Sequence, residues 1–170
     1  MRTAATLLIL LLVVSVGVFG LAFWKNGLPW NLPPGRMVRL VNYVTTHVAD
    51  TSEESMFPEL RPRRYAGVSA DALYGAVDRA VGKLGWAVIQ RDKGGRILRA
   101  VITTPLLKFE DDIEIAITEA GGGGPQLRAR SVSRVGQGDL GANTAHILAL
   151  YRTLDADLPW SGDAVGRAAH

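Results

Sequence analysis

The sequence contains no cysteine, and this absence excludes three kinds of chemistry at once. Without a thiol the chain forms no disulfide, offers no cysteine nucleophile and builds no cysteine-ligated metal site. Histidine is also scarce, and His47, His146 and His170 lack the spacing of metal ligands. The acidic run at 110–112 is predicted to lie on a strand, where neighbouring side chains point to opposite faces. We therefore expect no bound metal and no cofactor.

The charge distribution gives no sign of a nucleic-acid interface. The 19 basic and 16 acidic residues leave a net charge of +3. A nucleic-acid site needs lysine and arginine clustered on one face with aromatic residues between them, and no such cluster is visible. The small excess of positive charge is more typical of a soluble surface or of attraction to anionic lipid headgroups.

A long apolar run is the most prominent feature present. Residues 4–24 contain no charge for 21 positions, about the length of a helix that crosses a hydrocarbon core roughly 30 Å thick. The run ends with Phe23 and Trp24, which suit a membrane interface. We predict a transmembrane anchor, with a cleaved signal peptide and a buried helix as the alternatives. Counts of flanking positive charge do not settle the orientation, and an extracytoplasmic domain is weakly favoured.

The rest of the chain divides by composition into a spacer, one domain and a tail. Three prolines within 25–35 favour an extended spacer, and apolar residues at helical spacing from Met37 to Val48 indicate a short helix. The predicted organisation is a transmembrane anchor at 1–25, a Pro-rich spacer with a possible short helix at 26–57, an α+β domain at 58–160 and a flexible tail at 161–170.

Two further helices are predicted from periodicity and capping residues. Ser69 resembles an N-cap, and the apolar face that follows ends at Gly85. Asn143 is a good N-cap for a last helix, whose apolar residues recur at helical spacing as far as Leu158. Pro159 is expected to end that helix.

Alternating polarity predicts four strands between these helices. They cover 86–90, 96–103, 111–118 and 126–133, and glycine-containing turns make the first two and the last two hairpins. The glycine run at 121–124 precedes a strand rather than a helix, so we interpret it as a flexible hairpin loop and not as a phosphate loop. The expected fold class is α+β: after the transmembrane helix, a two-layer sandwich of a four-stranded antiparallel sheet and two main helices.

The alternation in the last two strands also predicts their register. The inward-facing pairs are expected to be Ile117 with Leu127, Ile115 with Ala129, Ile113 with Ser131 and Asp111 with Ser133. On the outward face this register places Glu114 opposite Arg130 and Glu110 near Arg134, which is a favourable arrangement of charge.

Three glycines after the last strand match the spacing G-x-G-x-x-G. They are Gly136, Gly138 and Gly141, and the pattern invites comparison with a dinucleotide-binding loop. No second parallel strand follows, however, and Asp139 would place a negative charge beside a pyrophosphate. The glycines instead predict a sharp corner with positive φ angles that leads into the last helix.

Beside this corner the predicted register collects polar side chains at one end of the buried face. Asp111 needs a partner there, since an unpaired buried charge is costly, and Arg134 or Ser133 is expected to supply it. The cluster is either a polar latch that fixes the last helix to the sheet or a small polar pocket for a ligand. A triad of Ser131 or Ser133 with His146 and Asp139 is conceivable, but no G-x-S-x-G elbow is present.

The sequences KFEDDIEIAI and RARSVSRVGQGDLGANTAHI resemble the bacterial domain-of-unknown-function family 1499. The matching positions are Phe109, Asp111, Asp112, Arg130, Ser131, Ser133, Arg134, Gly136, Asp139, Gly141 and Asn143. Members often show a Pro-Asn-Cys stretch that this chain lacks, and many resemble it in having an N-terminal membrane anchor. The resemblance implies no activity.

Three functional hypotheses follow. The first is a non-catalytic, membrane-anchored module in the bacterial inner membrane, with a periplasmic domain that binds an envelope protein or a small anionic or lipidic ligand through Arg130 and Arg134. The second is an envelope hydrolase that uses Ser131 or Ser133, and the third is a structural subunit of a membrane assembly. The candidate site comprises Asp111, Arg130, Ser131, Ser133, Arg134, Gly136, Asp139, Gly141 and Asn143.

Overall fold

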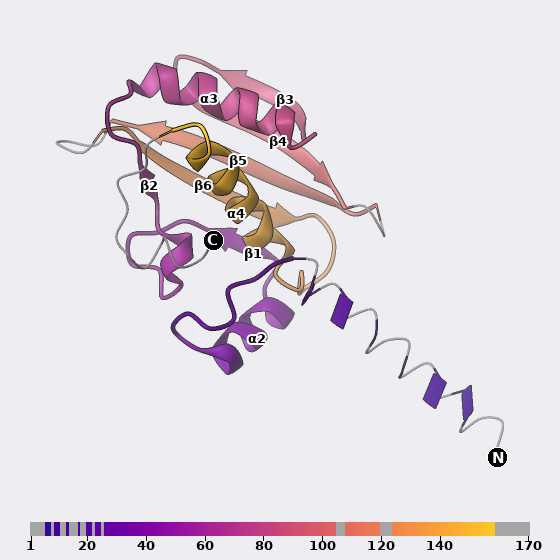
Figure 1. Cartoon of the computed structure of the whole chain (residues 1–170). Helices are drawn as coiled ribbons and strands as arrows, with labels where there is room; N and C mark the ends of the chain where they lie inside the picture. Colours follow the sequence, from indigo (N-terminus) through magenta and orange to yellow (C-terminus); the bar gives the residue numbers. More distant parts are fainter. Residues whose placement is uncertain are drawn as a thin grey trace.

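The computed structural model describes residues 26–104, 108–119 and 124–158, together with ten helical residues between 6 and 24 (Figure 1). Its helices are α2 (Arg36–Thr45), α3 (Ala70–Lys83), α4 (Ala142–Asp155) and a short 3-10 helix, Pro58–Leu60. Its strands are β1 (Val48–Asp50), β2 (Arg63–Arg64), β3 (Ala87–Asp92), β4 (Ile97–Thr103), β5 (Glu110–Thr118) and β6 (Gln126–Ser133). The predicted tail at 161–170 lies outside the described residues, as does most of the glycine run.

The strands form one antiparallel sheet in the order β1-β6-β5-β4-β3, and β2 also pairs with β6. Helices α3 and α4 cover one face of this sheet (Figure 1). The α+β class is as predicted, but the prediction of four strands and two main helices is wrong, since the sheet has six strands and three α-helices are described. Strands β1 and β2 contain three and two residues, too few to show an alternating pattern.

The prediction of a transmembrane helix is also wrong for the residues that the structure describes. Within the part of the chain that the structure describes, no helix is long and apolar enough to cross a membrane. The longest, α3 and α4, have 14 residues each and so extend about 21 Å, less than a hydrocarbon core of roughly 30 Å. Eleven positions of the predicted span at 4–24 lie outside the described residues.

The predicted helix 69–84 and the strand register are confirmed. The Ser69 hydroxyl accepts a hydrogen bond of 3.1 Å from the Ala72 amide, and Gly85 follows the helix with a φ of 72°. The β5–β6 pairs are Asp111 with Ser133, Ile113 with Ser131, Ile115 with Ala129 and Ile117 with Leu127. Seven of these eight side chains are buried, and Ser133 is half-buried, because the helices cover the inward face.

Helix α2 directs its apolar stripe outward. Its buried residues are Arg39 and Tyr43, whereas Met37, Val41 and Val44 are exposed. The helix also ends at Thr45, because the chain then becomes extended and joins the sheet as β1. The valine at position 48 therefore belongs to a strand and not to the helix.

Candidate functional site

The predicted site residues divide between the two faces of the β5–β6 pair. Asp111 and Ser131 point toward α4 and are buried, whereas Asp112 and Arg134 lie on the opposite face, which is called the uncovered face because no described helix packs on it. Arg134 binds Asp112 with two hydrogen bonds of 2.9 and 2.6 Å and also contacts Glu110. The expected neutralisation of Asp111 by Arg134 is therefore wrong, because alternate residues of a strand face opposite ways.

On the inner face, the side chain of Asn143 joins the last helix to the sheet. Its Oδ1 accepts a hydrogen bond of 2.5 Å from the Ser131 hydroxyl. Its amide nitrogen lies within hydrogen-bonding distance of Ser133 Oγ at 2.8 Å, the His47 carbonyl at 2.9 Å and Asp139 Oδ2 at 2.6 Å. Asn143 is fully buried, so these contacts replace the water that it would otherwise bind. This network is the polar latch between α4 and the sheet.

Asp111 and His146 form the least satisfied part of the inner face. Asp111 is 2 % exposed, and its Oδ2 has no hydrogen-bond partner among the described residues. The nearest basic atom is His146 Nδ1, 3.7 Å away. Burial raises the pKa of Asp111, although a hydrogen bond from Ser133 opposes that change, and burial lowers the pKa of His146 to about 4. Both shifts favour the neutral forms, so the pair is not a strong ion pair.

The glycine corner packs against the end of α2 and against Leu28. The prediction of positive φ is confirmed for Gly136 and Gly141, at 93° and 80°, and is wrong for Gly138. A Cβ at Gly138 would lie 2.2 Å from the carbonyl oxygen of Val44, and one at Gly141 would lie 2.4 Å from Leu28 Cδ1. The corner backbone also donates hydrogen bonds to the carbonyls at the end of α2, from residues 139 and 140.

Asp139 caps the last helix, a role that the sequence assigned to Asn143. Its Oδ1 accepts a hydrogen bond of 2.8 Å from the Gly141 amide, and its Oδ2 accepts one of 3.0 Å from the Asn143 amide. A carboxylate at a helix N-terminus satisfies free amides and meets the positive end of the helix dipole. Burial nevertheless raises the pKa of Asp139.

The inner face does not have the geometry of a serine hydrolase. Ser131 has no exposed surface, and its hydroxyl is 3.4 Å from His146 Nδ1. Asp111 approaches the same ring nitrogen, whereas a catalytic triad uses one nitrogen for the serine and the other for the carboxylate. No hydrogen bond joins Asp139 to His146 among the described residues. Within those residues there is likewise no group of three His, Asp or Glu side chains that could hold a metal.

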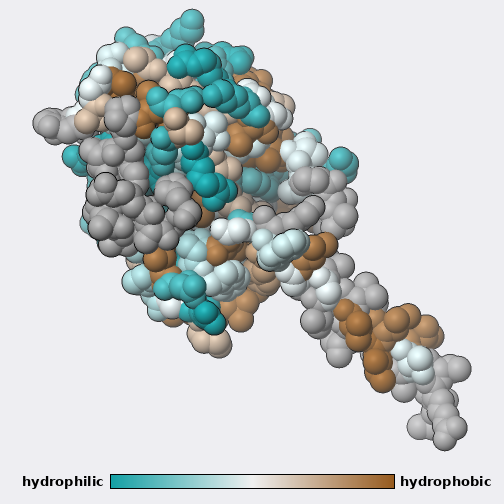
Figure 2. Space-filling model, viewed as in Figure 1, coloured by the Kyte–Doolittle hydropathy of each residue, from teal (hydrophilic) through white to brown (hydrophobic). Residues whose placement is uncertain are grey.

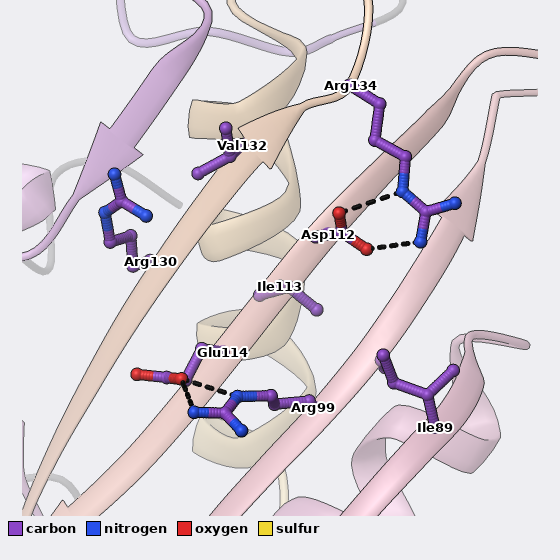
Figure 3. Close-up of a pocket in the computed structure, with 9 residues that line it drawn as sticks. Ile89, Arg99, Asp112, Ile113, Glu114, Arg130, Val132 and Arg134 are labelled. Carbon is purple, nitrogen blue, oxygen red and sulfur yellow. Dashed lines mark hydrogen bonds and ion pairs between the residues drawn. The ribbon is translucent and has the colours of Figure 1, made fainter.

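The uncovered face of the sheet carries a hollow of about 400 Å³ between β3 and β6. Its charged lining residues are Arg99, Asp112, Glu114, Arg130 and Arg134, and its apolar ones include Ile89 and Val132. Two of the arginines are held by carboxylates: Arg134 by Asp112 as above, and Arg99 by Glu114 at 2.7 and 2.6 Å (Figure 3).

Arg130 differs from the other two arginines of the hollow. It is exposed, and no ion pair joins it to any residue that the structure describes. Its cross-strand neighbours are Glu114 on β5 and Asp50 on β1, but Glu114 is bound to Arg99 and Asp50 makes no ion pair with it. Figure 3 shows Arg130 apart from both bound pairs. Among the described residues that line the hollow, Arg130 is the cation without an ion pair.

The sequence prediction missed Arg99 and Ile89 as parts of this surface. The β4–β5 register places Arg99 opposite Glu114. This register could not be predicted from the sequence, because no short turn joins the two strands. Ile89 is 61 % exposed because the β3–β4 register shifts between Val88 and Gln90. A bulge of this kind changes the face to which a side chain points, and the alternation of β3 alone did not reveal it.

Comparison with known proteins supports the resemblance seen in the sequence. No curated protein matches the chain. A family model described as "Protein of unknown function (DUF1499)" matches residues 40–154, which include the sheet, the glycine corner and most of α4. Since the match covers more than half of the sequence, the chain belongs to the DUF1499 family.

Proposed function

We propose that this protein is a non-catalytic binding module of the cell envelope, and that it binds a small anionic ligand on the uncovered face of its sheet. The observation that carries the proposal is the exposed guanidinium of Arg130, which lines the hollow without an ion pair among the described residues. Arginine presents two parallel N–H donors that match a carboxylate or a phosphate.

The neighbouring ion pairs make this guanidinium available. Glu114 is the residue that would neutralise Arg130, since the two lie opposite each other on β5 and β6. Arg99 engages Glu114 from the other side. A hollow of about 400 Å³ falls within the usual size of small-molecule sites, roughly 300–1,000 Å³. Ile89 and Val132 supply apolar contact for the uncharged part of a ligand.

The burial of Ser131 and the contacts of both serines argue against the hydrolase alternative. Ser131 is engaged with Asn143 beneath α4, and Ser133 is a neighbour of Asp111 and Asn143. Localisation to the envelope is part of the proposal and is supported by the apolar sequence at 4–24, which also suits a cleaved signal. Cell fractionation tests that part separately.

Calorimetric titration with glycerol 1-phosphate and with inorganic phosphate tests the ligand class. We expect Arg130→Gln to weaken binding by about tenfold or more, since a hydrogen bond to a charged group contributes about 1.5–3 kcal/mol. The matched control is Arg128→Gln, which removes an exposed arginine two positions earlier on the same strand. Equal losses in both variants, or no binding by the unmodified chain, would refute the proposed site.

A further inference from the structure

We propose that α2 lies on the surface of an anionic lipid bilayer through its exposed apolar side. This surface is separate from the hollow on the sheet, and the proposal requires no membrane-spanning helix. It depends on the outward-facing apolar side of α2, on the charge of the N-terminal third of the chain and on the aromatic residues beside the helix.

The apolar side of α2 is directed away from the protein. Its exposed fractions are 72 % for Met37, 45 % for Val38, 37 % for Leu40, 55 % for Val41 and 43 % for Val44. Five exposed apolar side chains on one ten-residue helix are unusual for a protein surface in water, where such residues are normally scattered. An amphipathic helix of this kind is suited to lie in the plane of a membrane interface.

The polar side of α2 is fixed inward by Arg39. Its guanidinium binds Glu59 through both terminal nitrogens, and it donates to the carbonyl of Leu32 at 3.1 Å and to Tyr43 Oη at 3.1 Å. It also lies over the ring of Phe57, 5.2 Å from its centre. Arg39 is fully buried, so rotating the apolar side inward would break this network and leave Glu59 unpaired. The outward orientation is therefore a stable feature of the fold.

The charge of this part of the chain favours an anionic surface. The first acidic residue of the sequence is Asp50, and four of the 19 basic residues precede it. The remaining 121 positions hold 15 basic and 16 acidic residues, so the positive excess of the protein belongs to its first 49 residues. Arg36 is exposed at the start of α2. Basic residues beside an apolar helix face attract anionic headgroups.

Aromatic residues connect α2 to the end of the apolar sequence run. The rings of Phe23 and Trp30 meet edge to face at 5.3 Å, and those of Trp30 and Tyr43 meet at 5.4 Å. Trp24 is 80 % exposed at the same end of the molecule. In Figure 2, hydrophobic residues show near α2 and along the described part of the N-terminal segment. Tryptophan with flanking basic residues is typical of a membrane interface.

A lipid surface explains these features better than a second copy of the chain does. A second copy of α2 would offer the exposed Arg36 no partner, because the helix has no acidic residue and its other arginine, Arg39, is buried and bound to Glu59. An anionic bilayer offers both a hydrocarbon region for the exposed valines and negatively charged headgroups for Arg36.

The lack of cysteine permits a direct test with single-cysteine variants of the full chain. An environment-sensitive fluorophore is attached at Met37→Cys or Val41→Cys, and at Val135→Cys as the control, since Val135 is 61 % exposed in the loop after β6. Each labelled protein is mixed with vesicles of phosphatidylglycerol and phosphatidylcholine, or of phosphatidylcholine alone. Lipids with brominated acyl chains report contact with the hydrocarbon.

We expect a blue shift and bromine quenching at positions 37 and 41 with the anionic vesicles, and neither at position 135. Arg36→Gln is expected to weaken the partitioning of the labelled helix about fivefold. Two results would overturn the proposal: vesicle-bound protein whose labels at 37 and 41 remain in water, or a blue shift that depends on protein concentration and not on lipid. The second result would assign the surface to a second copy.

Discussion

Glu114 and Arg130 lie directly opposite each other on β5 and β6, yet Glu114 forms its ion pair with Arg99 on β4. This pairing leaves the Arg130 guanidinium without an ion pair among the described residues of the hollow. The ion pair of Arg99 would therefore affect the proposed ligand binding without any contact between Arg99 and the ligand, because it keeps Glu114 away from Arg130.

Removing Arg99 is predicted to weaken anion binding indirectly. In Arg99→Met the freed Glu114 is expected to turn to Arg130 and compete with the ligand, and calorimetry should show binding about tenfold weaker, as for the loss of one charged hydrogen bond. The double variant Arg99→Met, Glu114→Gln should recover most of the lost affinity. If the double variant binds no better than the single one, Arg99 contacts the ligand itself or the proposed competition does not occur.

Loss of the Asn143 side chain is predicted to destabilise the fold. Asn143→Ala removes the acceptor of the Ser131 hydroxyl and one donor each to the His47 carbonyl and to Asp139, all in a buried site, so the free energy of unfolding in urea should fall by about 3 kcal/mol. Asn31→Ala is the control, since its contact with Arg36 is exposed and should contribute less than about 0.5 kcal/mol. Similar losses in the two variants would show that the latch contributes little.

The buried His146 predicts a loss of stability in mild acid. Its pKa in the folded chain is about 4, below its ordinary value of 6.5, so between these two pH values the unfolded chain binds a proton that the folded chain does not. Folding is therefore disfavoured as the pH falls through this window, by an amount that approaches about 3 kcal/mol near pH 4.

Comparison with His146→Gln isolates this contribution. The raised pKa values of Asp111 and Asp139 act in the opposite sense, because the folded chain binds their protons more readily, and both carboxyls remain in the variant. Urea unfolding of both proteins at several pH values should show the unmodified chain losing stability relative to the variant below about pH 6.5. If the free energy of unfolding changes with pH in the same way in both proteins, the His146 ring is not desolvated in the folded protein.

The glycine corner predicts opposite effects for two glycine substitutions. Gly138→Ala places a methyl group against the carbonyl oxygen of Val44, so we expect a loss of about 1–3 kcal/mol in the free energy of unfolding. In Gly82→Ala, which lies in α3, the added methyl group has no neighbouring atom within 4 Å. This substitution should stabilise the helix by up to about 1 kcal/mol. Thermal melts of both variants check this contrast, and a stable Gly138→Ala protein would refute close packing of the corner against α2.

The sequence predicted the parts of the fold in which one periodic pattern decides the structure. The β5–β6 register followed from alternating burial, since a shift by one residue would place isoleucines opposite arginines. The same alternation places Arg134 beside Asp112 and not beside Asp111, because Ser133 already occupies the inward position. The error in the expected Asp111–Arg134 contact could thus have been found from the sequence.

The packing of α2 was not accessible in the same way. Its apolar residues have helical spacing, which predicts a stripe but not the direction in which the stripe faces. That direction is set by Arg39, which binds Glu59 twenty positions away. Such a contact depends on the position of the short 3-10 helix that contains Glu59, and the sequence around that helix has no periodic pattern. The short strands β1 and β2 are stabilised mainly by pairing with β6, so they too depend on long-range structure.

The most direct measurement of the central claim is an NMR titration that observes the arginine side-chain Nε–H groups while glycerol 1-phosphate is added. The account predicts that the Arg130 Nε–H signal shifts progressively and that this proton exchanges more slowly with water, while the Arg128 signal does not shift. A titration in which Arg130 does not respond, or in which all exposed arginines shift together, would contradict a specific anion site on this face of the sheet.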